Sequence, residues 1–214
     1  TSSQSDPNSD VPDAATAAYI AHDEHGSLTM TVGGNLTLNS GSGTSGMVVI
    51  GSVGMTDVNL TVGGDLTATA GVGAVTIGSL AVNPLFNEPQ RGGDTNVIVH
   101  VGGNITLNGG STATGTVLVG SPDDKTAQVI LEDDPLPSGG TCSDRDGCIV
   151  HDGSAPVHVE LVAAKNITIN GATGRVTVGV KEPSPTDNVV PDSAPSSRVL
   201  IAAGAVPADI QSMF

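Results

Sequence analysis

The chain has 214 residues, with 22 acidic against 7 basic side chains and a formal net charge of −15. This charge excludes nucleic acid and anionic membrane surfaces as favourable partners, because both are themselves negative. No apolar run approaches the ~18 residues of a membrane-spanning helix, so no membrane span is expected. Aromatic residues make up 1% of the chain, which favours a narrow core of stacked aliphatic side chains.

The first 27 residues form a polar, acidic arm. Its first thirteen residues have the composition of a linker, and residues 14–21 fit either a short helix or a short strand. His22 and His25 enclose two carboxylates and are candidate ligands of a transition metal. A solvated loop explains the same residues more simply, so no metal site is assigned.

A repeat occurs three times within residues 28–121 and a fourth, degenerate time over 159–180. Each copy has an alternating strand, a Gly-Gly corner followed by Asn or Asp, a second strand, a small-residue turn and a third strand. Apolar residues step by two within the strands, which is strand spacing and not helix spacing. Such copies bury their apolar faces by stacking on one another. The expected fold is therefore all-β, a right-handed parallel β-solenoid; an antiparallel sandwich of hairpins is the alternative.

The copies are unevenly spaced. The second corner glycine recurs at intervals of 30 and 39 residues, and the matching residue of the fourth copy follows after 62; these positions are Gly34, Gly64, Gly103 and Lys165. A regular coil of 30 residues therefore needs an excursion before the third copy and either an excursion or a degenerate coil before the fourth. The non-repetitive segments 83–94 and 122–156 provide these excursions.

Three regions follow from this organisation. Residues 1–27 are the acidic arm, 28–180 the solenoid with its excursions, and 181–214 a proline-rich linker with one last strand. We expect the apolar strand residues of the repeats to face inward and stack: Val32, Leu36, Leu38, Val49, Val62, Leu66, Val75, Ile77, Val101, Ile105, Leu107, Val117, Val119, Ile167, Ile169, Val176 and Val178.

The second excursion contains both cysteines, Cys142 and Cys148. In an exported protein this spacing indicates a local disulfide that pins the excursion; two free thiols in a cytosolic protein are the alternative. Asp144 and Asp146 lie between them and partly match a calcium-binding loop, but the remaining ligand positions are missing. No cofactor is expected, and calcium at this loop is the one candidate.

Four Asn-x-Thr sequences begin at Asn35, Asn59, Asn104 and Asn166. Each is a formal glycosylation site. The simpler interpretation is that Asn suits the corner conformation before a strand, where stacked copies can form a hydrogen-bonded ladder.

No catalytic residues are expected. A polysaccharide-cleaving enzyme needs two or three converging carboxylates, whereas the coils supply only Asp65 at a corner and a lone Glu160. Motifs of serine hydrolases, zinc peptidases and phosphate-binding loops are absent from the sequence. Phe86 and Arg91, on the first excursion, are the candidates for exposed contacts, because loops on a rigid scaffold commonly bind partners.

The corner phrases support a resemblance to a family. They are Val32-Gly33-Gly34-Asn35-Leu36-Thr37-Leu38-Asn39, Val62-Gly63-Gly64-Asp65-Leu66-Thr67 and Val101-Gly102-Gly103-Asn104-Ile105-Thr106-Leu107-Asn108-Gly109. Over 28–121 and 157–180 the chain resembles the β-solenoid repeats of large bacterial exoproteins, the filamentous-haemagglutinin-like adhesins of two-partner secretion and related autotransporter passengers. The resemblance implies a right-handed parallel β-helix, export by a Gram-negative-like cell, and a fibre or adhesin role. Those exoproteins are usually far longer, with shorter and more regular repeats.

The function expected from these features is structural: an extracellular or cell-surface fibre subunit that associates with itself head to tail. A stack of roughly five to seven coils ends in open sheet edges that invite another chain. The assembly candidates are Ala17, Tyr19, Ile20, Val199, Leu200 and Ile201, which either donate strands to a neighbour or fold back as caps. A polysaccharide-binding or polysaccharide-cleaving β-helix protein, with host or matrix carbohydrate as its partner, is the alternative. Ice binding through the pairs Thr29/Thr31 and Thr67/Thr69 is a third hypothesis.

Overall fold

The computed structural model describes residues 17–22, 26–42, 46–53, 56–80, 95–122, 125–130, 148–154, 157–180 and 197–204. Over these residues the protein is built from strands alone. In chain order they are β1 (Ala17–His22), β2 (Gly26–Val32), β3 (Leu36–Asn39), β4 (Met47–Val53), β5 (Thr56–Val62), β6 (Leu66–Thr69), β7 (Val75–Leu80), β8 (Thr95–Val101), β9 (Ile105–Asn108), β10 (Val117–Ser121), β11 (Lys125–Ile130), β12 (Cys148–Ser154), β13 (Val157–Ala163), β14 (Ile167–Asn170), β15 (Val176–Val180) and β16 (Arg198–Ala203).

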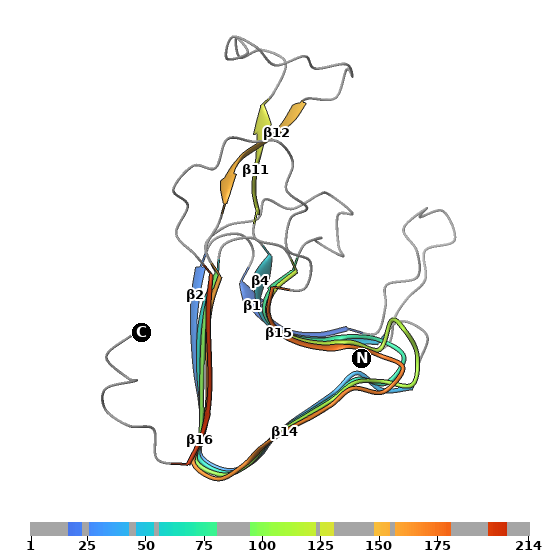
Figure 1. Ribbon diagram of the computed structural model, residues 1–214, viewed down its shortest axis with the longest axis vertical. Helices are drawn as coiled ribbons and strands as arrows, with labels where there is room; N and C mark the ends of the chain where they lie inside the picture. Colours follow the sequence, from blue (N-terminus) through green and yellow to red (C-terminus); the bar gives the residue numbers. More distant parts are fainter. Residues whose placement is uncertain are drawn as a thin grey trace.

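Fourteen of these strands form three parallel sheets that are the sides of a triangle (Figure 1). We call them sheet A, with the order β1-β4-β7-β10-β15; sheet B, with the order β2-β5-β8-β13-β16; and sheet C, with the order β3-β6-β9-β14. The chain passes through B, C and A in turn, four times over. The described residues thus form four complete coils, fewer than the five to seven expected, with β1 added to sheet A at one end and β16 to sheet B at the other.

Strand pairing between the coils decides against the antiparallel sandwich. Each strand of one coil pairs in parallel and in register with the matching strand of the next coil, so that Leu60 lies beside Val99 and Leu66 beside Ile105. This pairing confirms an all-β parallel solenoid. The corners of successive repeats consequently lie one above another, as their identical sequences indicate.

The long interval before the fourth repeat is an excursion and not a degenerate coil. β13 pairs directly with β8, and β15 pairs directly with β10, so the third and fourth coils are adjacent. Between them β11 and β12 pair with each other in an antiparallel hairpin. This hairpin projects from the corner at which sheet A leads into sheet B (Figure 1).

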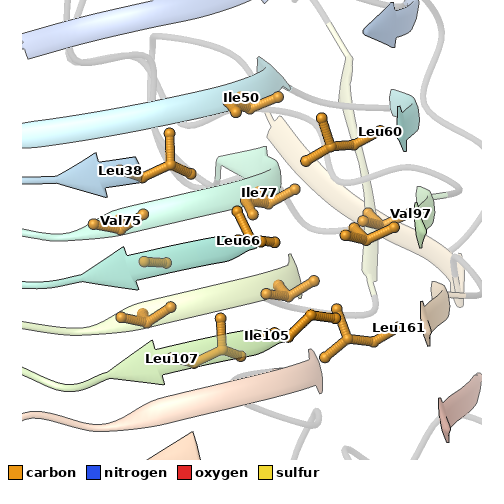
Figure 2. Close-up of a cluster of buried hydrophobic side chains, with 14 of the residues drawn as sticks. Leu38, Ile50, Leu60, Leu66, Val75, Ile77, Val97, Ile105, Leu107 and Leu161 are labelled. Atoms are coloured by element: carbon orange, nitrogen blue, oxygen red, sulfur yellow. The ribbon is translucent and has the colours of Figure 1, made fainter. Parts of the chain in front are cut away.

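The interior of the triangle holds the apolar core. Figure 2 shows side chains from all three sheets pointing into the same space, with Leu66 and Leu107 from sheet C, Val75 and Ile77 from sheet A, and Leu161 from sheet B. These side chains are fully buried, although the largest of them are only Leu and Ile. A narrow triangle has no room for aromatic rings, which accounts for their near absence from the sequence.

The expected set of inward residues needs two corrections. Val49 is buried, but its neighbours Val48 and Ile50 are the residues that share rows with the interior positions Val75 and Ile77. Val49 therefore faces the other side of sheet A, because successive side chains alternate across a strand. Ile169 has an interior position as expected, yet it is 44% exposed, because no described strand follows β14 in sheet C.

A row of glycines bends the strands of sheet A. Gly51, Gly78, Gly120 and Gly179 occupy equivalent positions in four coils, and each has a positive φ between 111° and 146°. A side chain at Gly120 would meet the carbonyl oxygen of Gly179 at 2.1 Å. The recurring Val-Gly or Ile-Gly at the end of each repeat is therefore a requirement of backbone conformation and of stacking distance.

Candidate functional site

The two ends of the stack are the first candidate site. At the end formed by the first coil, β1, β2 and β3 are the outermost strands of sheets A, B and C. At the opposite end β15, β16 and β14 have the same place. Within the described part of the chain, no further strand pairs with the outer edge of these terminal strands, and such an edge is a template for another chain.

Among the described residues, each end is extended by a further strand in only one of its three sheets. β1 lies beside β4 in sheet A, and β16 lies beside β13 in sheet B. Both strands continue their own chain's sheets, as the interpretation of the termini as caps expects. At each end the other two sheets stop one strand earlier, so the described cap strands cover the ends incompletely.

Interior side chains are exposed at these ends. Five large apolar side chains of the described residues are exposed, and four of them occupy interior rows of terminal strands: Ile20, Ile169, Val199 and Ile201. Ile201 shares its row with Leu161 and Val99, which are both fully buried. The apolar side chains exposed at the ends therefore belong to the interior rows of the solenoid, at the last described strand of each row.

Tyr19 is the fifth exposed apolar side chain. It pairs with Val49 and so faces the outer side of sheet A, with its hydroxyl 3.9 Å from Sδ of Met47. Partial burial raises the pKa of the Tyr19 phenol. Leu200, on β16, also has an outward position, because it lies between Val199 and Ile201 along the strand. The expected assembly residues thus divide between the interior rows and the outer faces.

A groove on the outer face of sheet B is the second candidate site. It has a volume of about 430 Å³, and its wall includes Thr61, His100, Glu160 and Leu200. Nε2 of His100 lies 2.5 Å from Oε1 of Glu160, on the neighbouring strand. This pair supplies one carboxylate, whereas glycoside cleavage by paired acids needs two. The groove therefore offers an imidazole and a carboxylate for hydrogen bonding to a ligand.

A side-chain ladder follows the corner between sheets B and C. Oδ1 of Asn35 accepts a hydrogen bond from the backbone N–H of Asp65 (2.8 Å), and Oδ1 of Asp65 accepts one from that of Asn104 (2.7 Å). Nδ2 of Asn166 donates to Oδ1 of Asn104 (3.0 Å). A side chain at Gly64 would meet Oδ1 of Asn35 at 2.1 Å, so the corner glycine leaves room for the ladder.

The ladder confirms the structural interpretation of three of the four Asn-x-Thr sequences; the fourth, at Asn59, lies within β5 and not at a corner. The backbone N–H of Asn104 is the main cause that holds the pKa of Asp65 below its ordinary value, with smaller contributions from the Asn104 amide and from Lys165. Asp65 is thus a structural carboxylate whose oxygen links two coils.

The threonine pairs considered for ice binding do not share a face. Thr29 and Thr31 lie on β2 in sheet B, whereas Thr67 and Thr69 lie on β6 in sheet C. A single row of threonines does run up sheet C, through Thr37, Thr67, Thr106 and Thr168. The flanking rows mix Asn with Asp or Thr.

Several expected site residues lie outside the described residues: His25, Phe86, Arg91, Cys142, Asp144 and Asp146. Cys148 begins β12 and His22 ends β1, and only their backbone positions are described. Over the described part of the chain, no three His, Cys, Asp or Glu side chains converge as a metal site would require. The described segments also include no helix that is long and apolar enough to span a membrane.

Sequence reasoning missed two features. The pairing of His100 with Glu160 depends on the register between β8 and β13, which lie on either side of the second excursion. The exposure of Ile169 and Ile201 was detectable in principle, since the last copy of any stacked repeat has no following copy to cover its apolar row.

Comparison of the chain with protein-family models finds no match, and neither do comparisons with curated proteins and with solved structures.

Proposed function

We propose that this protein is an extracellular structural protein, a subunit or segment of a surface fibre or adhesin, that associates with itself through the ends of its solenoid. The observation that carries the proposal is the exposure of interior side chains at both ends of the stack, Ile20 at one and Ile169, Val199 and Ile201 at the other. Burying such side chains against another copy is favourable by roughly 25 cal/mol per Å² of apolar area.

The corner phrases support export to a bacterial cell surface, because they resemble those of two-partner-secretion adhesins and autotransporter passengers. In this proposal the coils are right-handed, the hand of nearly all parallel crossover connections. A disulfide between Cys142 and Cys148 pins the second excursion, and non-reducing mass spectrometry is expected to find the two thiols oxidised. Two free thiols would remove this support for export.

Analytical ultracentrifugation over a range of protein concentrations tests the self-association. The wild-type protein is expected to grow in mass with concentration, with filaments visible by electron microscopy. Ile201→Lys, which places a charge in the open core at one end, is expected to abolish the growth without lowering the melting temperature. Thr168→Lys is the matched control, because Thr168 is also exposed in the terminal region but faces the outside of sheet C.

Two results would contradict the proposal. One is a wild-type protein that stays monomeric at the highest attainable concentration. The other is an Ile201→Lys protein that assembles as readily as the Thr168→Lys control, since a charge at a buried end contact is strongly unfavourable.

The groove beside His100 and Glu160 favours a second candidate function, binding of a carbohydrate. Hydroxyl-rich ligands suit a shallow groove that offers an imidazole, a carboxylate and the Thr61 hydroxyl. Affinity electrophoresis against neutral and acidic polysaccharides is expected to show retardation that Glu160→Gln reduces. Equal mobility with and without every polysaccharide would exclude this function, and turnover of any of them would instead establish an enzyme.

A further inference from the structure

We propose that successive copies of this protein join head to tail through one shared coil, in which β16 of one copy and β1 of the next lie in the same layer. This inference rests on the end-to-end association proposed above and specifies its geometry. The partner is a second copy of the same chain. One copy contributes β16 to the sheet B side of the shared layer, and the next copy contributes β1 to its sheet A side.

Sheets A and B each have one strand more than sheet C, and the two additional strands lie at opposite ends of the stack. Sheet B extends one strand beyond the last complete coil, through β16, and sheet A extends one strand before the first complete coil, through β1. When the two ends meet, β16 fills the sheet B position of a new layer and β1 of the next copy fills its sheet A position. Sheets A and B then run without interruption from one copy into the next.

The register of the known pairs determines the register at the junction. β16 continues the sheet B rows whose last strand at the opposite end of the stack is β2, so Leu200 is expected beside Thr29 of the next copy. In sheet A, β1 continues the rows of β15, so Tyr19 of the next copy is expected beside Thr177. Both alignments hold at once only when the copies are offset by one shared layer.

The exposed core residues support this register. Val199 and Ile201 belong to the rows that contain Leu28 and Met30, which are only partly buried at the first coil. Ile20 belongs to the row that contains Val178, which is only partly buried at the last coil. At the junction, the exposed side chains of Ile20, Val199 and Ile201 thus each meet an incompletely covered member of their own row in the adjoining copy.

Head-to-tail joining also keeps every contact parallel. A head-to-head junction would reverse the strand direction across the interface, and would place strands of unlike length and unlike corners beside each other. Such a junction closes after two copies, whereas a head-to-tail junction leaves a free end of each kind and continues into a filament. In the described residues the shared layer has no sheet C strand, so sheets A and B supply the contact.

Disulfide trapping between copies tests the register. Leu200→Cys and Thr29→Cys are expressed as separate single variants, mixed while dilute, concentrated to allow assembly and then oxidised. Adjacent strands lie ~4.8 Å apart, within the reach of a disulfide, so a covalent dimer is expected in the mixture. A control mixture uses Ser27→Cys in place of Thr29→Cys. The Cα atoms of residues 27 and 200 are expected to lie roughly 8 Å apart across the junction, which is too far for a disulfide. The wild-type chain, with its own two cysteines, is oxidised in parallel as the background.

A second pair, Tyr19→Cys with Thr177→Cys, tests the sheet A contact independently and keeps the test valid if one sheet B variant misfolds. Covalent dimers from both matched mixtures, and none above background from the shifted one, are the expected result. Assembly without either covalent dimer would overturn the shared coil while leaving self-association intact. Dimers of one single variant with itself would show a head-to-head or tail-to-tail junction instead. A protein that never assembles would overturn the proposed function together with this junction.

Discussion

Ile169 lies directly beside Leu107 in the same interior row of sheet C, yet Leu107 is fully buried and Ile169 is 44% exposed. The two side chains are both aliphatic and equal in size, and their main difference is their place in the stack. Leu107 has a strand on each side, and Ile169 has one on a single side. Their contrast separates the contribution of stacking from that of residue type.

The first prediction uses this contrast. Leu107→Ala is expected to lower the free energy of unfolding by about 2–5 kcal/mol, the usual cost of a cavity in a well-packed core. Ile169→Ala is expected to cost well under half as much, because much of the Ile169 side chain already contacts water. Chemical denaturation of both variants measures the difference. Equal losses would show that the end of the stack is covered in the free protein.

The second prediction concerns the glycine row. Gly120→Ala is expected to destabilise the protein by at least about 1–3 kcal/mol, because φ there is +133° and the new Cβ would lie 2.1 Å from the Gly179 carbonyl oxygen. Gly171→Ala serves as the control, since no atom lies within 4 Å of a Cβ at that position. Thermal unfolding of the two variants compares them, and similar melting temperatures would contradict the stacking of the row.

The third prediction concerns acid stability. The pKa of Asp65 is lower in the folded protein than its ordinary value, so ionised Asp65 stabilises the fold at pH values above about 4. That stabilisation is lost as the pH falls from there through the folded-state pKa. Asp65→Asn removes the titrating group and keeps an oxygen that can accept from Asn104, so its stability is expected to fall less steeply below pH 4.

Melting temperatures of both proteins at several pH values down to about 2 test this, with the difference between the two curves as the readout. Both proteins carry the same other carboxylates, so the contributions of those groups to the pH dependence cancel in the difference. Parallel curves would mean that the ladder at Asp65 does not couple protonation to folding.

The fourth prediction concerns salt. A chain with a net charge of −15 repels its own copies, and this repulsion opposes association at either end of the stack. Raising the ionic strength from 0.01 to 1 M shortens the screening length from about 30 to about 3 Å, so assembly is expected to begin at a lower protein concentration. Light scattering across a salt series measures the onset. An onset that moves to higher protein concentration with salt would indicate that attraction between charges, and not burial of apolar side chains, joins the copies.

Most of the coil was predictable from local sequence. Alternation at Leu28, Met30 and Val32 identifies a strand and the face it buries, because side chains of a strand alternate with a period of two. The Gly-Gly-Asn corner indicates both a sharp bend and a stacked ladder, since its recurrence places equal side chains at equal positions. These features depend on neighbours in sequence or on neighbouring copies of the same phrase.

The third strand of each repeat was less predictable. Met47, Val48, Val49 and Ile50 are four consecutive apolar residues, so no alternation shows which of them face the interior. The pairing of Val48 with Val75 decides which of these residues face the interior, and that pairing depends on the lengths of the turns before β4 and β7. The expectation that Val49 faces inward was therefore wrong, although the residue is buried.

The sequence by itself determined that this chain is a stack of three-strand coils with a small aliphatic interior, because repeat, corner and alternation are all local or periodic signals. Only the tertiary structure decided that β1 extends sheet A while β16 extends sheet B, and that interior residues such as Ile20 and Ile201 are exposed at opposite ends. The physical reason is that the sheet a terminal strand joins is set by hydrogen bonds to a strand tens of residues away, which the residues of the terminal segment do not reveal.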